Sequence, residues 1–127
     1  MSVIREAGED YLEAILQIEK INECVRSVDV ANRLGVSRPS VNKAIGILRE
    51  AGMVEQQPYG DIKLTQLGRE RAEAVSRRHA LIKRFLVEAL QVEEMVAEQD
   101  ACKMEHAISA QTMARWAEFV AKYLEDN

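Results

Sequence analysis

The stretch that decides the fold is Ser27–Gly52, which reads SVDVANRLGVSRPSVNKAIGILREAG. Its first part, residues 27–34, predicts a short helix, and Gly35 follows as the natural stop because glycine adopts left-handed backbone conformations cheaply. Ser37 then offers an N-cap, and Pro39 fits the first turn of a second helix. Two helices joined by so short a turn containing glycine indicate a helix-turn-helix.

The residues after the turn extend this prediction to a winged helix. The second helix is expected to run to about Ala51, with apolar residues at helical spacing on one face, namely Val41, Ala44, Ile45 and Leu48. Residues 54–57 and 62–64 then read as two short strands around the turn sequence Pro58–Asp61. A helix-turn-helix followed directly by a hairpin is typical of a winged helix.

Helical patterns flank this unit on both sides. Residues 8–20 form an amphipathic pattern, residues 66–90 a long one with Leu86 and Leu90 on its apolar face, and residues 93–107 and 109 onward two more. The predicted fold class is therefore mainly α with a small β-hairpin. We expect a winged-helix DNA-binding domain over residues 1–70 and a helical metal-binding and dimerisation domain over residues 71–127.

Composition narrows the class of protein. The chain has 127 residues, 47% hydrophobic and 30% charged, which is ordinary for a globular protein of one or two small domains. The apolar runs are too short for a membrane span or a signal peptide, so we expect a cytoplasmic protein. The two cysteines, Cys24 and Cys102, do not make a disulfide framework, and we expect Cys24 to be a small packed apolar residue.

Charge is distributed unevenly along the chain. The formal net charge is −4, yet residues 26–63 carry six Lys or Arg against four acids. A weakly basic segment in an acidic protein favours an approach of that segment to phosphate groups.

The second helix of a helix-turn-helix places its N-terminal residues in the DNA major groove. Arg and Lys there bind guanine edges or phosphates, Asn pairs with adenine, and Ser serves either role. The predicted DNA-binding residues are Ser37, Arg38, Pro39, Ser40, Asn42 and Lys43, with Tyr59 and Lys63 of the wing. A solvated polar face is the alternative. Because one winged-helix unit makes few phosphate contacts, we expect a homodimer that binds a palindromic operator in double-stranded DNA. We expect the two copies to contact one another through the C-terminal helices that carry Trp116 and Phe119.

A second group of residues has the chemistry of metal ligands. A helix over residues 93–107 places Cys102, Glu105 and His106 at positions i, i+3 and i+4, on one face. The carboxylates of Asp10 and Glu13 and the imidazole of His79 are further donors on other helices. Each has an ordinary explanation: surface side chains, a helix histidine near the core, or carboxylates favoured by a helix N-terminus.

Taken together, these six residues predict a divalent-metal site: Asp10, Glu13, His79, Cys102, Glu105 and His106. An ion held by all of them would fix the first helix against the C-terminal helices. Because the first helix is expected to pack on the helix-turn-helix, metal binding would orient the DNA-reading helices.

With these features the chain resembles the diphtheria toxin repressor and manganese transport regulator family of metal-dependent repressors. The matching pieces are Glu9–Glu13, Ser37–Val41, Leu64–Gly68, Arg78–Leu81 and Cys102–His106. The resemblance covers essentially the whole chain. It implies a homodimer, a winged-helix domain, a helical dimerisation domain and metal-activated repression of metal-uptake genes.

The resemblance leaves two candidates for the activating metal, manganese and iron. Asp10 and Glu13 are similar to the manganese-responsive members, which are also short, whereas Cys102 is similar to the iron-responsive ones. Carboxylates suit Mn²⁺, and a thiolate draws the site toward Fe²⁺, Co²⁺ or Zn²⁺. We expect Mn²⁺, with Fe²⁺ as the alternative and with Zn²⁺, Co²⁺ or Ni²⁺ binding in vitro.

Two other function classes compete with a metal-dependent repressor. A winged-helix regulator that senses no metal would bind DNA equally well in a chelator. A metal hydrolase would use Glu105 or Glu13 as general base on a metal-bound water. The sequence has no glycine-rich phosphate loop, nucleophile elbow or HExxH pattern, so no enzyme activity is expected.

Overall fold

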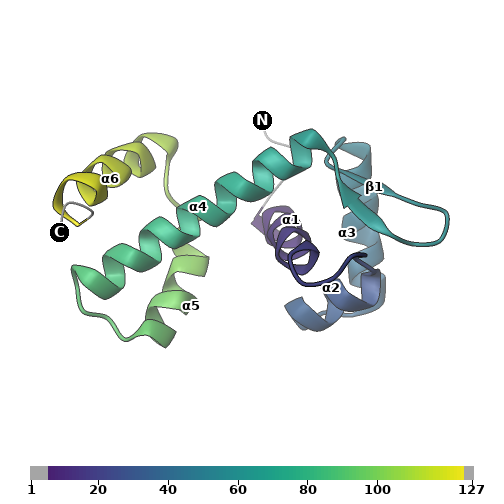
Figure 1. Cartoon of the computed structure of the whole chain (residues 1–127), viewed down its shortest axis with the longest axis horizontal. Coiled ribbons are helices and arrows are strands. Elements are labelled where there is room, and N and C mark those ends of the chain that lie inside the picture. The colour runs from purple at the N-terminus through teal and green to yellow at the C-terminus, as the bar shows by residue number, and fades with distance from the viewer. Residues whose placement is uncertain (1–5, 125–127) are drawn as a thin grey trace. The chain divides into compact units, whose positions relative to one another are not determined.

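The computed structural model of the chain describes residues 6–124 and contains six helices and one hairpin in that range (Figure 1). The mainly helical fold with a small hairpin is as the sequence predicts. The elements are α1 (Glu6–Glu19), α2 (Ser27–Leu34), α3 (Arg38–Glu50), β1 (Val54–Gln56), β2 (Ile62–Leu64), α4 (Gln66–Glu88), α5 (Glu94–Met104) and α6 (Ala110–Tyr123).

The chain divides into two compact units between Ala74 and Val75, within α4. The core of the first unit joins α1, α2, α3 and the hairpin, with Leu12, Ile15, Val30, Ile45 and Leu48 each at most 1% exposed. The predicted apolar stripes of α1 and α3 are therefore the ones that pack together, as helical periodicity requires.

The ends of the helices in this unit follow from local chemistry. Gly35 ends α2 with a φ of 67°, in the left-handed region that glycine tolerates best. Ser37 caps α3 by accepting a hydrogen bond from the Ser40 N–H at 3.2 Å. Thr65 caps α4 in the same way, accepting from the Gly68 N–H at 3.0 Å. The roles of Gly35 and Ser37 are the ones that the sequence predicts.

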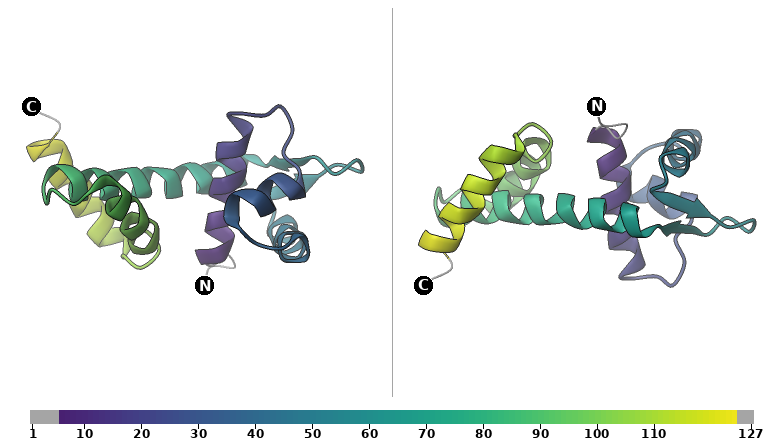
Figure 2. Two further views of the ribbon diagram at one scale, coloured as in Figure 1. Left: turned by 90° about the horizontal axis from the view of Figure 1, so that it is seen from below. Right: turned by 90° about the horizontal axis from the view of Figure 1, so that it is seen from above.

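The hairpin is antiparallel, with Glu55 opposite Lys63, and it projects from the unit as a narrow wing (Figure 2). Buried Asp61 anchors it: its Oδ1 accepts a hydrogen bond from the Val25 N–H at 3.2 Å, and the Ile62 N–H donates to the Val25 carbonyl at 2.8 Å. These bonds hold the base of the wing beside the start of α2.

In the second unit α5 and α6 flank the C-terminal part of α4, which crosses α6 obliquely (Figures 1 and 2). The core lies where the three helices meet and contains Ile82, Leu86, Ala97, Ala101 and Met113. The prediction for Leu90 is wrong, because α4 ends at Glu88 and Leu90 is 57% exposed. Gln91, with a φ of 58°, turns the chain toward α5 instead.

Two further predictions from the sequence concern the burial of Cys24 and the absence of a membrane-spanning helix. Cys24 is exposed, so its predicted packing is wrong, and neither Cys24 nor Cys102 forms a disulfide within the described residues. Within residues 6–124 no helix combines the length and the apolarity that a membrane crossing needs.

Candidate metal centre and nucleic-acid interface

The cluster at the end of α5 forms where the helix stops. Helix α5 ends at Met104, and Glu105 follows with helical dihedrals while its N–H still donates to the Ala101 carbonyl at 3.0 Å. The turn therefore continues for one more residue, and Glu105 keeps nearly the position that an uninterrupted helix would give it. The i, i+3 spacing from Cys102 thus brings both side chains to one side.

Residue His79 of α4 meets this cluster within the second unit. Its Nδ1 lies 3.1 Å from Glu105 Oε2. One donor atom from each of His79, Cys102 and Glu105 lies within 4.8 Å of the others. The spacing is close to that of donors around one ion, since two donors each about 2.2 Å from a metal lie roughly 3.5 Å apart in tetrahedral geometry. The nitrogen, sulfur and oxygen donors converge on one place.

Buried Glu105 makes this place unusual. It is 1% exposed, and its Oε1 has no hydrogen-bond partner among residues 6–124. His106 Nε2 lies 3.3 Å from that oxygen, but the arrangement does not have hydrogen-bond geometry. A buried carboxylate with an unsatisfied oxygen is costly unless a cation compensates it. The donor set and the unsatisfied oxygen both fit a divalent metal.

Two charged residues beside His79 were not among the predicted ligands. Glu98 of α5 contacts His79 Nε2, and Lys83 Nζ lies 3.0 Å from the other Glu98 oxygen, Oε1. The hydrogen bond to Glu98 raises the pKa of Lys83 despite the opposing effect of desolvation. Desolvation alone would raise the pKa of Glu98, but its contacts with Lys83 and His79 outweigh this and lower it. Both groups are therefore charged at neutral pH.

The remaining predicted metal ligands, Asp10 and Glu13, lie three residues apart on α1, in the first unit, and both are half-buried. Neighbouring Glu9 is 7% exposed and pairs with Arg71, whose Nε lies 2.8 Å from its Oε2. Glu19 pairs in the same way with Arg69 at 3.0 Å. These two ion pairs bind α1 to the first turns of α4 and fix the register of the helix that carries Asp10 and Glu13.

The predicted DNA-binding residues all lie on the surface of the first unit. The start of α3 and the two wing residues are exposed: Ser37, Arg38, Pro39, Ser40, Asn42, Lys43, Tyr59 and Lys63. Tyr59 at the wing tip is 64% exposed. Asn42 Oδ1 accepts a hydrogen bond from Ser27 Oγ at 3.1 Å, so in the free protein its amide N–H₂ group is the part available to a ligand.

A cavity of about 530 Å³ lies among these elements, and one of its lining residues, Arg26, was not among the predicted DNA-binding residues. Its lining joins the start of α2, the start of α3 and the wing: Arg26, Ser27, Val28, Arg38, Asn42, Gln56, Tyr59 and Gly60. Arg26 precedes α2 at its N-cap, and its position next to that helix start was the signal available in the sequence. Two arginines with hydroxyl, amide and phenol groups favour an anionic ligand such as a DNA phosphate.

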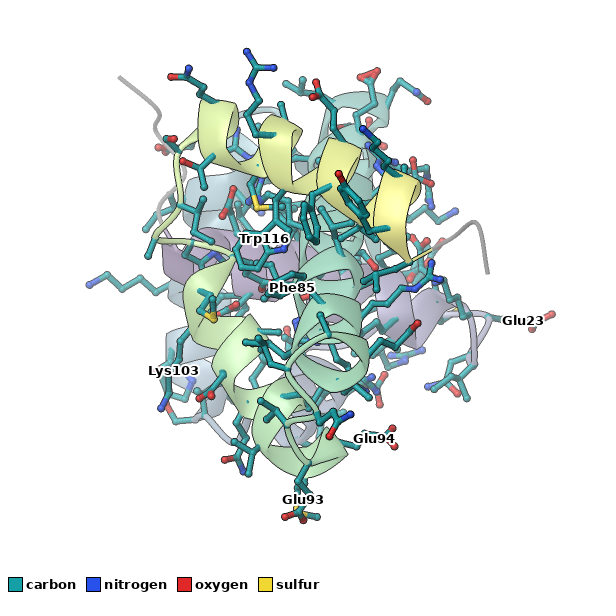
Figure 3. The ribbon with its side chains drawn as sticks, turned by 90° about the vertical axis from the view of Figure 1, so that its left-hand side faces the viewer. Glu23, Phe85, Glu93, Glu94, Lys103 and Trp116 are labelled. Atoms are coloured by element: carbon teal, nitrogen blue, oxygen red, sulfur yellow. The ribbon has the colours of Figure 1, made fainter. Side chains whose placement is uncertain are left out.

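A groove of about 490 Å³ lies on the surface of the second unit. It is lined by Phe85, Gln111, Thr112, Arg115, Trp116 and Phe119. Figure 3 shows Phe85 and Trp116 facing one another between α4 and α6, and their rings pack edge to face with centroids 5.2 Å apart. Phe119, 44% exposed, extends the aromatic surface outward. This is the surface predicted to form the dimer.

Comparison with known proteins places both halves of the chain in one family. Residues 4–62 match the family model described as the iron-dependent repressor N-terminal DNA-binding domain. Residues 65–127 match the model of the iron-dependent repressor metal-binding and dimerisation domain. The two models correspond to the winged helix and to the helical part that carries His79, Cys102 and Glu105.

Individual relatives agree. The chain is 37% identical to an uncharacterized HTH-type transcriptional regulator of Methanocaldococcus jannaschii, over 91% of this chain and 93% of the relative. It is also 37% identical to the transcriptional regulator MntR of Escherichia coli O6:H1, over 94% of this chain and 76% of that one.

Among solved structures, a manganese-dependent transcriptional repressor in complex with manganese superposes with a TM-score of 0.83 and 33% identity over 90% of the chain. The chain spans about half of that protein, 52% of its length. Fold, family models and relatives agree: the chain belongs to the iron-dependent repressor family of metal-dependent, DNA-binding transcriptional regulators.

Proposed function

We propose that the chain represses metal-uptake genes and that Mn²⁺ activates it. The observation that carries this proposal is buried Glu105, whose carboxylate lies beside the donor atoms of His79, Cys102 and His106 and keeps one oxygen, Oε1, without a hydrogen-bond partner among the described residues. In the metal-free protein the negative charge of this carboxylate is poorly compensated. Binding of a divalent cation there is therefore strongly favourable in free energy. Bound metal supplies positive charge to this cluster.

The proposed ligands are the six that the sequence predicts: Asp10, Glu13, His79, Cys102, Glu105 and His106. Asp10 and Glu13 lie on α1, which shares its core with α2 and α3. An ion bound by these carboxylates therefore acts on a helix in direct contact with the DNA-reading elements. Their donor chemistry, hard oxygen atoms, supports Mn²⁺.

Activation by Fe²⁺ is the second candidate, and Cys102 supports it. Its thiol is exposed at the end of α5 and contributes the single sulfur donor of the cluster. A soft sulfur ligand strengthens binding of Fe²⁺ relative to Mn²⁺. The same thiol makes the site sensitive to oxidation.

The DNA target in this proposal is a palindromic operator bound by a homodimer. The exposed start of α3 faces base edges, and the cavity that contains Arg26 and Arg38 holds a backbone phosphate. The aromatic groove between α4 and α6 provides an apolar surface for the second copy, consistent with the dimerisation domain of the family.

Metal-dependent operator binding tests the proposal directly. A DNA duplex is first selected from random sequence in the presence of Mn²⁺, and its binding is then followed by fluorescence anisotropy with reduced, anaerobic protein. We expect tight binding with Mn²⁺ or Fe²⁺ and a loss of affinity in chelator. Asp10→Ala should bind DNA as poorly as the chelated protein. Equal DNA affinity with and without metal would contradict the proposal and leave a regulator that senses no metal.

Replacing the sulfur ligand should change the preferred metal. Cys102→Glu is expected to shift the ratio of the Fe²⁺ and Mn²⁺ activation constants toward Mn²⁺ by about tenfold, because a hard oxygen replaces a soft sulfur. Anisotropy titrations with each metal measure the ratio. Cys24→Glu makes the same change at the other exposed thiol and should leave the ratio unaltered. An unaltered ratio in the Cys102 variant would remove this residue from the ligands.

Removing Arg38 should weaken DNA binding. We expect Arg38→Ala to cost about 1 to 3 kcal/mol of operator affinity and, because its guanidinium binds a phosphate in this proposal, to reduce the slope of log affinity against log salt by about 1. Arg49→Ala, at the opposite end of α3 and also exposed, is the matched control. Equal affinities for the two variants would exclude the start of α3 as the contact surface.

A further inference from the structure

A row of charged and polar side chains joins α4 to α5 beside the metal cluster. His79 and Lys83 lie four residues apart on α4, and Glu94 and Glu98 lie four residues apart on α5, so each pair lies on one face of its helix. Lys83 Nζ lies 3.0 Å from Glu98 Oε1 and 3.5 Å from Glu94 Oε1. The two faces meet as a ladder of opposite charges.

The contacts of His79 differ on its two sides. Nε2 contacts Glu98 Oε2, while Nδ1 lies 3.1 Å from Glu105 Oε2, inside the group formed with Cys102. A neutral imidazole carries its proton on one nitrogen and offers a lone pair on the other. A carboxylate that accepts the N–H of a metal-binding histidine fixes both the tautomer and the ring orientation.

We propose that Glu98 is a positioning residue for His79, and that Lys83 keeps it in this role by binding its other carboxylate oxygen. Glu98 accepts the Nε2–H, so Nδ1 presents its lone pair toward Cys102 and Glu105. Lys83 acts as an internal cation that occupies Glu98 Oε1, and Glu98 is a hydrogen-bond acceptor, not a metal ligand. This assignment rests on the proposed metal site and adds to it a residue pair that controls its affinity.

The first test replaces Glu98. In Glu98→Ala we expect the Mn²⁺ affinity, measured by isothermal titration calorimetry, to fall about 10- to 100-fold, with the number of ions bound per protomer unchanged. Lys103→Met, which alters an exposed side chain of α5 that points away from the helices (Figure 3), is the control for a change of charge in the same unit. Circular dichroism of each variant establishes that the helices are intact.

The second test reads the imidazole itself. In the Zn²⁺-loaded wild-type protein we expect ¹⁵N chemical shifts of a protonated Nε2 and a metal-bound Nδ1 for His79. The chain has only two histidines, so the signals are assigned by comparison with a His106→Gln variant. In Glu98→Ala the Nε2–H loses its acceptor, and its ¹⁵N and ¹H shifts should move. Lys83→Arg keeps a cation at Glu98 and should reproduce the wild-type spectrum.

A double-mutant cycle isolates the part played by Lys83. The effect of Lys83→Met on Mn²⁺ affinity is measured in the wild-type and in the Glu98→Ala backgrounds, so that the long-range effect of the charge cancels. We expect the two effects to differ by at least a few-fold, with the larger loss where Glu98 is present. Equal effects would show that Lys83 does not act through Glu98.

The outcomes separate this inference from the function on which it rests. Loss of one bound ion per protomer in Glu98→Ala would make Glu98 a ligand and overturn its positioning role. Unchanged affinity and unchanged His79 shifts would also overturn it. Failure of the wild-type protein to bind Mn²⁺ would instead contradict the proposed function.

Discussion

Glu105→Gln is expected to abolish metal-dependent operator binding. The substitution keeps the shape of the side chain but removes the charge that is most completely buried in the cluster, where Glu105 is 1% exposed. Loss of this ligand should lower Mn²⁺ affinity by about 100-fold or more, beyond the usual effect of changing a residue that only supports a ligand. Calorimetry and DNA-binding anisotropy at the same metal concentration measure the two effects.

The same variant separates metal binding from folding. In chelator, Glu105→Gln should have a melting temperature equal to or above that of the wild-type protein, because a buried, poorly compensated carboxylate destabilises the metal-free fold. Glu118→Gln, at a 69% exposed carboxylate of α6, is the control and should change neither property. A lower melting temperature in chelator for the Glu105 variant would mean that its charge stabilises the fold without metal.

Gly68→Ala is expected to destabilise the winged-helix unit strongly. A Cβ at position 68 would lie 1.9 Å from the Met53 carbonyl oxygen, which is backbone and cannot rotate away. The start of α4 would have to move away from the backbone of Met53, in the connection between α3 and β1. We expect a loss of about 3 kcal/mol or more in the free energy of unfolding, measured by urea denaturation.

The chain offers a matched control in Gly46→Ala. Gly46 also lies inside a helix, α3, and, apart from the adjoining residues and backbone of that helix, no atom in the described part of the chain lies within 4 Å of the Cβ that it would acquire. Alanine is the better helix former, so this variant should be more stable by about 0.5 to 1 kcal/mol. Equal stability changes at the two positions would show that the contact with Met53 does not restrict Gly68.

The winged helix could be predicted because its signals are local. Gly35 and Ser37 act on backbone groups within a few residues, and the helix stop and cap that they form are the predicted ones. The apolar stripes of α1 and α3 follow from the period of the helix itself. Such features depend on sequence distance, and the structure adds mainly their exact bounds.

Errors arose where packing between distant residues decides the result. Leu90 has the spacing of a core residue, but the helix ends before it and Gln91 turns the chain away. Cys24 lies in a connection whose position depends on the wing, and it is exposed. Arg26 and Arg38 line one cavity because the starts of α2 and α3 pack together, as the hydrogen bond from Ser27 to Asn42 shows, and the hairpin lies beside them.

The sequence by itself determined the helix-turn-helix, the wing and the kinds of donor atom available to a metal. The tertiary structure decided which of those atoms meet. His79 is 26 residues from Glu105 along the chain, and their contact at 3.1 Å exists because α4 and α5 pack through Ile82, Ala97 and Ala101. The structure also determined that Glu105 is buried with an unsatisfied oxygen and that Lys83 pairs with Glu98 beside it. Burial and ion pairing arise when tertiary packing excludes water from these side chains. The helical spacing of residues in the sequence does not determine which side chains lose their contact with water.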